Sequence, residues 1–179
     1  MEEAKGGPQV VTYGPPQPGS GTPTSILAGG VKSLGDAAIA YARGGWRVFP
    51  LYEPQGSGCA CGKADCSKVG KHPRIPNWPH DASSDPATVA AWWSRWPGAN
   101  IGLSLDGLVV LDVDPKNTGF ESLAALEQEH GPLDMRARQR SGSGGWHYLF
   151  EVVPGVEKRV KFLPGLDLLT GPGCFIVVE

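Results

Sequence analysis

The sequence lacks the features that mark several broad classes of protein. It has no apolar run long enough to cross a bilayer as a helix. Its N-terminus has no apolar segment of the kind that a secretory signal peptide needs. We therefore expect a cytoplasmic protein that makes no use of a membrane.

An excess of basic residues is also missing. The chain has 16 lysines and arginines against 18 acidic residues, which gives a formal net charge of −2. Overall charge therefore provides no attraction to nucleic acid, and any such binding must depend on local clusters.

Cysteine is scarce, with four residues in 179. Cys174 stands alone in an apolar run, whereas the other three fall within one short stretch: Cys59, Cys61 and Cys66. An odd cluster in a cytosolic chain favours a metal over disulfides. With His72 as the fourth ligand, or His80 in reserve, the set suits tetrahedral Zn²⁺. We predict a structural zinc-binding loop over residues 56–74; the alternative is three reduced cysteines in an unstructured loop.

Glycine and proline are abundant but unevenly spread. Many of the 26 glycines and 17 prolines lie near the N-terminus, where few apolar residues could form a core. We therefore expect a flexible tail over residues 1–32 and one folded domain over residues 33–179, which is long enough to bury a core.

Apolar periodicity and capping residues predict a mixed α/β (α+β) fold with a mostly antiparallel sheet. Three helices are expected. The first is capped by Ser33 or Asp36 and ends at Gly44-Gly45. The second covers residues 86–96 after the N-cap Asp85, and the third covers residues 119–131 with Gly131 as its C-cap. Strands are expected over residues 46–51, 100–105, 107–114, 166–169 and 174–178, with a further hairpin around a glycine-rich bend. The Asp106-Gly107 pair predicts a tight turn between two of these strands.

One strand ends in two carboxylates. Leu108 to Leu111 form an apolar run that leads into Asp112 and Asp114. Side chains two residues apart on a strand share a face, so these carboxylates project together and repel unless a cation or proton intervenes. Mg²⁺ and similar hard cations prefer such oxygen ligands. The alternative is a pair of solvated turn residues before Pro115.

The glycine-rich bend precedes a histidine. The bend contains Ser141, Gly142, Ser143, Gly144 and Gly145, and His147 begins the apolar strand that follows. Successive amide groups in such a bend can bind phosphate oxygens, and the two hydroxyls add donors. Alternating arginines, including Arg140, precede the bend. A plain hairpin loop with a surface histidine is the alternative.

A third acidic residue, Asp167, lies between leucines on a late strand. A carboxylate among apolar residues is costly unless it is paired or bound to a metal, although a half-exposed strand would let it face water.

Taken in order, these segments resemble the bifunctional primase–polymerase domain of the archaeo-eukaryotic primase superfamily, over about residues 34–179. Three strings are similar to its functional motifs. Asp112 and Asp114 match a hydrophobic–DxD string, and Leu166-Asp167 matches a hydrophobic–Asp string. Ser141 to His147 match an sGxGxH-like string, with one additional residue between the serine and the histidine.

The resemblance implies a template-directed nucleotidyltransferase that makes and extends primers in DNA replication of the phage or plasmid kind. Asp112, Asp114 and Asp167 would hold two catalytic Mg²⁺ or Mn²⁺ ions. Ser141 and His147 would contact the triphosphate, and the bend glycines, Arg140 and Lys71 are further candidates. The implied fold is a small α/β lobe packed on an RRM-like sheet, and a similar cysteine loop recurs in some relatives.

The implied partners are a DNA template and primer, nucleoside triphosphates and a replicative helicase. Family members usually continue beyond the last strand, so we expect this domain to be C-terminally incomplete at Glu179. Template binding would depend on local clusters such as residues 136–140 and 158–161. Two alternatives use the same residues: a metal-dependent phosphodiesterase or nuclease, and a non-catalytic zinc-bearing module that binds DNA.

Overall fold

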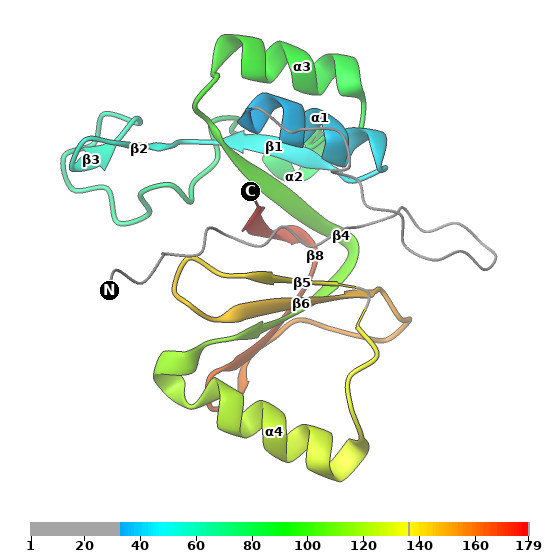
Figure 1. The fold of residues 1–179 in the computed structure, drawn as a ribbon. Helices are drawn as coiled ribbons and strands as arrows, with labels where there is room; N and C mark the ends of the chain where they lie inside the picture. The colour runs from blue at the N-terminus through cyan, green and yellow to red at the C-terminus, as the bar shows by residue number, and fades with distance from the viewer. Residues whose placement is uncertain (1–32, 136, 179) are drawn as a thin grey trace, which may run out of the picture. The chain divides into compact units, whose positions relative to one another are not determined.

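The computed structural model describes residues 33–135 and 137–178; the predicted tail, Arg136 and Glu179 lie outside these ranges. The helices are α1 (Leu34–Arg43), α2 (Trp78–Asp81), α3 (Pro86–Arg95), the 3-10 helix η1 (Pro115–Asn117) and α4 (Gly119–His130). The strands are β1 (Val48–Leu51), β2 (Pro54–Gln55), β3 (Gly58–Cys59), β4 (Asn100–Val113), β5 (Ala137–Arg140), β6 (Trp146–Glu151), β7 (Arg159–Leu163) and β8 (Leu166–Val178) (Figure 1).

Six of the strands form one sheet. Its order is β5-β6-β4-β8-β7, and β1 also pairs with β4, while β2 and β3 form a separate short hairpin. Strand β4 runs antiparallel to β1 and to β6, as β6 does to β5 and β8 to β7. The predicted mixed fold with a mostly antiparallel sheet is therefore confirmed. None of the helices in the described ranges is long and apolar enough to cross a bilayer.

The described chain divides into two compact units. One comprises residues 108–170, and the other comprises residues 33–107 together with residues 171–178. The predicted carboxylates and His147 all lie in the first unit, whereas the cysteine loop lies in the second.

In the first unit, helix α4 covers one face of the sheet. Its Leu123 packs in a buried cluster with Leu111, Val113, Tyr148 and Leu166. Because strand residues alternate between faces, the neighbours of these apolar residues point to the opposite face. This alternation determines where the polar side chains of the candidate site lie.

In the second unit, the helices begin at the predicted caps. The Ser33 hydroxyl accepts a hydrogen bond from the Asp36 amide and starts α1. At α3, the Thr88 hydroxyl and the amides of Thr88 and Ala87 donate to the Asp85 carboxylate, which holds its pKa below the usual range. Helix termini of this kind need only local partners, so the sequence predicts them well.

The predicted tight turn at Asp106-Gly107 is wrong. β4 continues through both residues as a single strand, in which Gly107 has a φ of 85°. Arg47 binds the Asp106 carboxylate at 2.5 Å. The first half of β4 pairs with β1 and the second half with β6, so the glycine accommodates an irregularity within the strand rather than a reversal.

The two late strands are also a single strand. β8 runs without a break from Leu166 to Val178, and Gly171 adopts a φ of 89° within it. Strand β7 was not predicted from the sequence, and its first four residues, Arg159 to Phe162, are all exposed. A strand with no buried face lacks the alternation of apolar and polar residues by which strands are recognised in a sequence.

Candidate functional site

Three polar side chains form a row across neighbouring strands of the first unit. Asp112 on β4 lies opposite His147 on β6, and His147 lies opposite Gln139 on β5. The distance from His147 Nε2 to Asp112 Oδ1 is 3.6 Å, and the distance from His147 Nδ1 to Gln139 Nε2 is 2.9 Å. The imidazole is therefore held on one side by an amide and faces a carboxylate on the other.

The environment of this row differs from one end to the other. The His147 side chain is only 12% exposed, whereas that of Asp112 is 32% exposed. Trp146 and Tyr148 flank His147 and pack against the α4 face, so His147 points to the opposite face. Asp112, between Leu111 and Val113, points to that same face.

Asp114 lies at the end of β4 and begins the 3-10 helix η1. Its carboxylate accepts hydrogen bonds from the Lys116 amide at 3.0 Å and from the Asn117 side chain at 2.7 Å. Because the backbone stays extended through Asp114, its side chain is on the same face as that of Asp112. The predicted pairing of these two carboxylates on one face is consistent with the backbone.

Asp167 lies on the neighbouring strand. The Asp114 amide donates to the Gly165 carbonyl at 2.8 Å, and the Thr170 hydroxyl donates to the Leu108 carbonyl at 2.7 Å. β4 and β8 therefore run antiparallel, with Asp112 and Asp167 at about the same level. Since Leu166 is buried in the α4 cluster, Asp167 points to the same face as the other two carboxylates.

The three carboxylates share a face, but their oxygens do not converge on one point. Within the described residues, only the cysteine and histidine set brings three or more metal-binding groups close together. Asp167 instead accepts from the Lys161 amide at 2.5 Å. Each carboxylate can accept about four hydrogen bonds or metal contacts, so Asp114 and Asp167 retain acceptor capacity. Hard oxygen donors of this kind suit Mg²⁺ or Mn²⁺.

The glycine-rich bend closes on itself. The Ser141 amide donates to the Gly145 carbonyl, the Gly144 amide donates to the Ser141 carbonyl, and the Gly145 amide donates to the Ser141 hydroxyl. The Ser141 and Ser143 hydroxyls are 2.9 Å apart. Ser141 therefore holds the shape of the bend that precedes His147.

Gly145 allows this bend to approach β4 closely. A Cβ atom at this position would lie 2.1 Å from the Val113 carbonyl oxygen and 2.9 Å from Pro115 Cδ. Only glycine fits there without moving the end of the strand that carries Asp112.

We expect Gly145→Ala to lower the melting temperature by about 4–10 °C, because overpacking of this kind costs roughly 1–3 kcal/mol. Gly142→Ala is the matched control, since a Cβ atom there meets nothing within 4 Å. Thermal melts followed by circular dichroism measure both. Equal melting of the two variants would show that the bend does not need its close contact with β4.

Two further glycines, which the sequence reading missed, connect β4 to the turn before Asp167. A Cβ atom on Gly119 would lie 2.6 Å from the carbonyl oxygens of both Asp114 and Gly165. Gly165 has a φ of 69°, and its Cβ atom would lie 2.5 Å from the Gly119 amide nitrogen. This close packing fixes the ends of β4 and β8 to each other, and with them Asp112 and Asp167.

Two predicted nucleotide-binding residues lie outside the row formed by Asp112, His147 and Gln139. Arg140 pairs with Trp146 across the hairpin, and its guanidinium lies 5.8 Å from the Trp146 ring centroid, on the other face of the sheet. Lys71 belongs to the second unit, in the cysteine loop. Gln139, which the sequence reading missed, is the β5 residue that contacts His147 instead; the alternation of Arg138, Gln139 and Arg140 is the signal that could have identified it.

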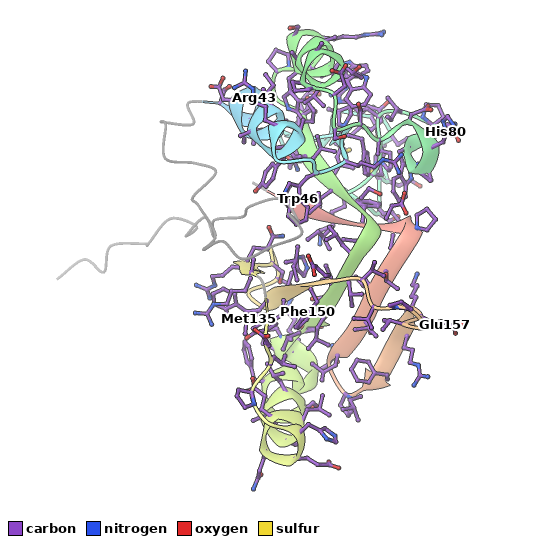
Figure 2. The ribbon with its side chains drawn as sticks, turned by 90° about the vertical axis from the view of Figure 1, so that its right-hand side faces the viewer. Arg43, Trp46, His80, Met135, Phe150 and Glu157 are labelled. Carbon is purple, nitrogen blue, oxygen red and sulfur yellow. The ribbon has the colours of Figure 1, made fainter. Side chains whose placement is uncertain are left out.

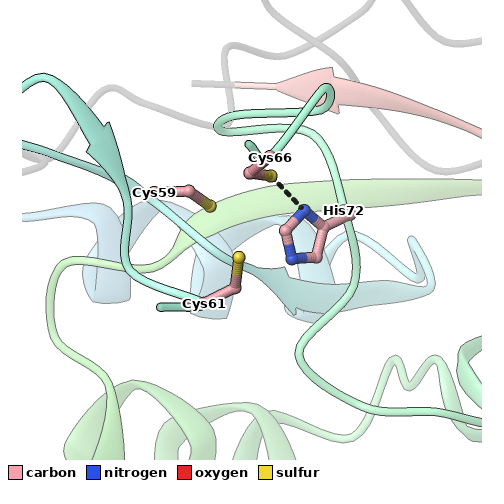
Figure 3. A group of neighbouring side chains, drawn as sticks. All are labelled: Cys59, Cys61, Cys66 and His72. Carbon is pink, nitrogen blue, oxygen red and sulfur yellow. Dashed lines mark hydrogen bonds between the residues drawn. The ribbon is translucent and has the colours of Figure 1, made fainter. Parts of the chain in front are cut away.

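The predicted zinc ligands come together in the second unit. The Sγ atoms of Cys59, Cys61 and Cys66 and a ring nitrogen of His72 all lie within 4.8 Å of one another (Figure 3). The Cys66 sulfur lies 3.5 Å from His72 Nδ1. Three thiols and one imidazole at this separation are consistent with a tetrahedral Zn²⁺ site. His80, the reserve ligand, instead contacts Asp81.

The thiols of the cluster differ in acidity. Burial opposes ionisation of Cys59, but hydrogen bonds from Cys61, Gly70 and Cys66 outweigh it and lower its pKa. The Lys68 backbone favours the Cys66 thiolate, yet burial and the neighbouring thiols outweigh it and raise the pKa of Cys66. Zinc binds thiolates, so binding of the metal is coupled to the release of protons from these thiols.

The cluster is connected to α3 through stacked side chains. The His72 ring lies 4.7 Å from the Tyr52 ring, and the Arg74 guanidinium lies 4.5 Å from Tyr52 and 5.3 Å from Trp96. Arg74 also binds Glu53 at 2.6 Å. The side chains of His72, Tyr52, Arg74 and Trp96 thus form a continuous series of contacts from the cluster to the end of α3.

Comparison with known proteins adds one finding. The model of a family described as bifunctional DNA primase/polymerase, N-terminal, matches residues 38–179, which include every residue of both candidate sites. No curated protein matches the sequence.

Proposed function

Because this chain belongs to the bifunctional DNA primase/polymerase N-terminal family, we propose that it synthesises and extends primers on a DNA template from nucleoside triphosphates. The observation that carries this proposal is the face shared by Asp112, Asp114, Asp167 and His147. Within this family, we assign the fold to the archaeo-eukaryotic primase type, with an RRM-like sheet formed by the strands of residues 108–170.

The three carboxylates are suited to hold two divalent cations. Mg²⁺ or Mn²⁺, when bound, would lower the pKa of a 3′-hydroxyl and neutralise charge on the leaving pyrophosphate. Asp112 and Asp114 supply oxygens from one strand and Asp167 from the next. The glycine contacts at Gly119 and Gly165 hold these two strands in register.

His147 is suited to contact the triphosphate. With the Gln139 side-chain nitrogen as the donor to Nδ1, that ring nitrogen is the acceptor and Nε2 carries the proton. Nε2–H would then point toward Asp112 and any phosphate bound beside it. Since the other bend amides donate within the bend, those of Gly142 and Ser143 would meet a phosphate oxygen.

The second unit would contribute a structural Zn²⁺ bound by Cys59, Cys61, Cys66 and His72. All four protein ligands are supplied by one loop, which leaves no position for substrate in a tetrahedral site. The zinc therefore orders the loop rather than taking part in phosphoryl transfer.

The experiment is a primer-synthesis assay with single-stranded DNA, Mn²⁺ or Mg²⁺, and labelled ribo- or deoxyribonucleotides. We expect new oligonucleotides and elongation of an annealed primer. Cleavage of the template without synthesis would replace the proposal with a nuclease. DNA binding with neither synthesis nor cleavage would replace it with a non-catalytic DNA-binding module.

A further inference from the structure

Strand β7 forms one edge of the sheet and exposes almost all of its side chains. Arg159, Val160, Lys161 and Phe162 are exposed, with Val160 53% and Phe162 37% accessible. In Figure 2 the label of Glu157 marks the turn that leads into this strand. These exposed cationic and apolar side chains contribute little to a hydrophobic core. Packing therefore does not explain why they occur together on this strand.

The charge of this strand is strongly positive and unpaired. Lys158, Arg159 and Lys161 lie within four residues, and none of them forms an ion pair with another described residue. Glu157 is the acidic residue next to them in the chain. The opposite edge of the sheet differs, because the guanidiniums of Arg138 and Arg140 lie 4.7 and 5.8 Å from the Trp146 ring.

The strand is joined to the candidate site through a bulge. The register between β7 and β8 shifts between Arg159 and Leu163, and Lys161 adopts a φ of 53° within the shift. A non-glycine residue rarely takes this conformation, and bulges often redirect groups next to active sites. Here the bulge turns the Lys161 amide toward the Asp167 carboxylate, at 2.5 Å.

We propose that Lys158, Arg159, Lys161 and Phe162 form a binding surface for single-stranded DNA, here named the β7 surface. Cations bind the phosphates of a flexible strand, and an exposed aromatic ring stacks on a base without regard to sequence. The hydrogen bond from the Lys161 backbone amide to the Asp167 carboxylate places strand β7 next to β8, the strand that carries one of the proposed catalytic carboxylates. Use of the β7 surface for template or primer depends on the proposed function, but DNA binding does not.

The test is a fluorescence anisotropy titration of a labelled oligothymidylate at several salt concentrations. Lys158→Ala combined with Arg159→Ala should raise Kd about tenfold and reduce the slope of log K against log [salt] by about 1.4, for two lost contacts. Phe162→Ala should raise Kd about fivefold or more and leave this slope unchanged. Thermal melts verify that the variants are folded.

The matched control is Arg43→Ala combined with Arg95→Ala, which removes the same charge from exposed positions in the last turns of α1 and α3, in the second unit. We expect its Kd to stay within about twofold of the wild-type value. Equal weakening by both double variants would overturn the proposal, as would wild-type binding by the β7 variants or tighter binding of duplex than of single strands. DNA binding through β7 without any synthesis would support the surface while removing the proposed function.

Discussion

Replacing Asp112 with asparagine is expected to reduce primer synthesis at least about 10³-fold. The substitution keeps the shape of the side chain but removes the charge that would bind a cation. Loss of such electrostatic stabilisation costs several kcal/mol, and each 1.36 kcal/mol is a factor of ten in rate. Steady-state nucleotide incorporation on a primed template measures the effect.

Asp134→Asn is the matched control for this substitution. Asp134 is exposed and lies in the same unit, so it undergoes the same chemical change away from the candidate site. We expect normal synthesis from this variant and wild-type DNA binding from both. More than about a tenth of wild-type synthesis by Asp112→Asn would remove Asp112 from the metal site.

Loss of one zinc ligand is expected to have the second large effect. Purified wild-type protein should contain about one zinc ion, and Cys66→Ser should contain almost none, because hydroxyl oxygen is a far poorer zinc ligand than thiolate sulfur. In a loop with few apolar residues, the binding of a structural zinc ion supplies much of the free energy of folding. The loop should therefore become sensitive to proteases between Gly56 and His72, which limited proteolysis with mass spectrometry detects.

The fourth cysteine provides the control. Cys174 lies on β8, is buried, and is separate from the ligand set. We expect Cys174→Ala to retain about one zinc ion and wild-type protease resistance of the loop. An unchanged zinc content in Cys66→Ser would mean that the four residues do not form the site.

Local chemistry determined which parts of the fold the sequence could predict. Ser33 and Asp85 cap the N-termini of α1 and α3, and Gly131 caps the C-terminus of α4. These helix termini lie close to the predicted positions because each cap acts within one turn of its helix. The strands were harder to predict. Gly107 and Gly171 signal turns in the sequence, yet both lie inside long strands because pairing with distant partners decides the backbone path.

In the candidate site, too, the features set by local sequence could be predicted, whereas those set by pairing between strands could not. Alternation along one strand predicts that Asp112 and Asp114 share a face, and the extended backbone at Asp114 is consistent with this prediction. The role of Arg140 depended instead on the register of the β5–β6 hairpin, which pairs Arg140 with Trp146 and Gln139 with His147. The bend that sets this register closes through contacts of Ser141 and Gly145, which the sequence reading did not resolve.

The bulge in β7 also has a consequence for self-association. An open sheet edge offers a row of amides and carbonyls to which another chain can add a strand. At Lys161 this row is irregular, since the amide is turned toward Asp167, and the cations of Lys158, Arg159 and Lys161 repel a second copy of the same edge. The irregularity and the cations therefore make β7 a poor template for the addition of another strand.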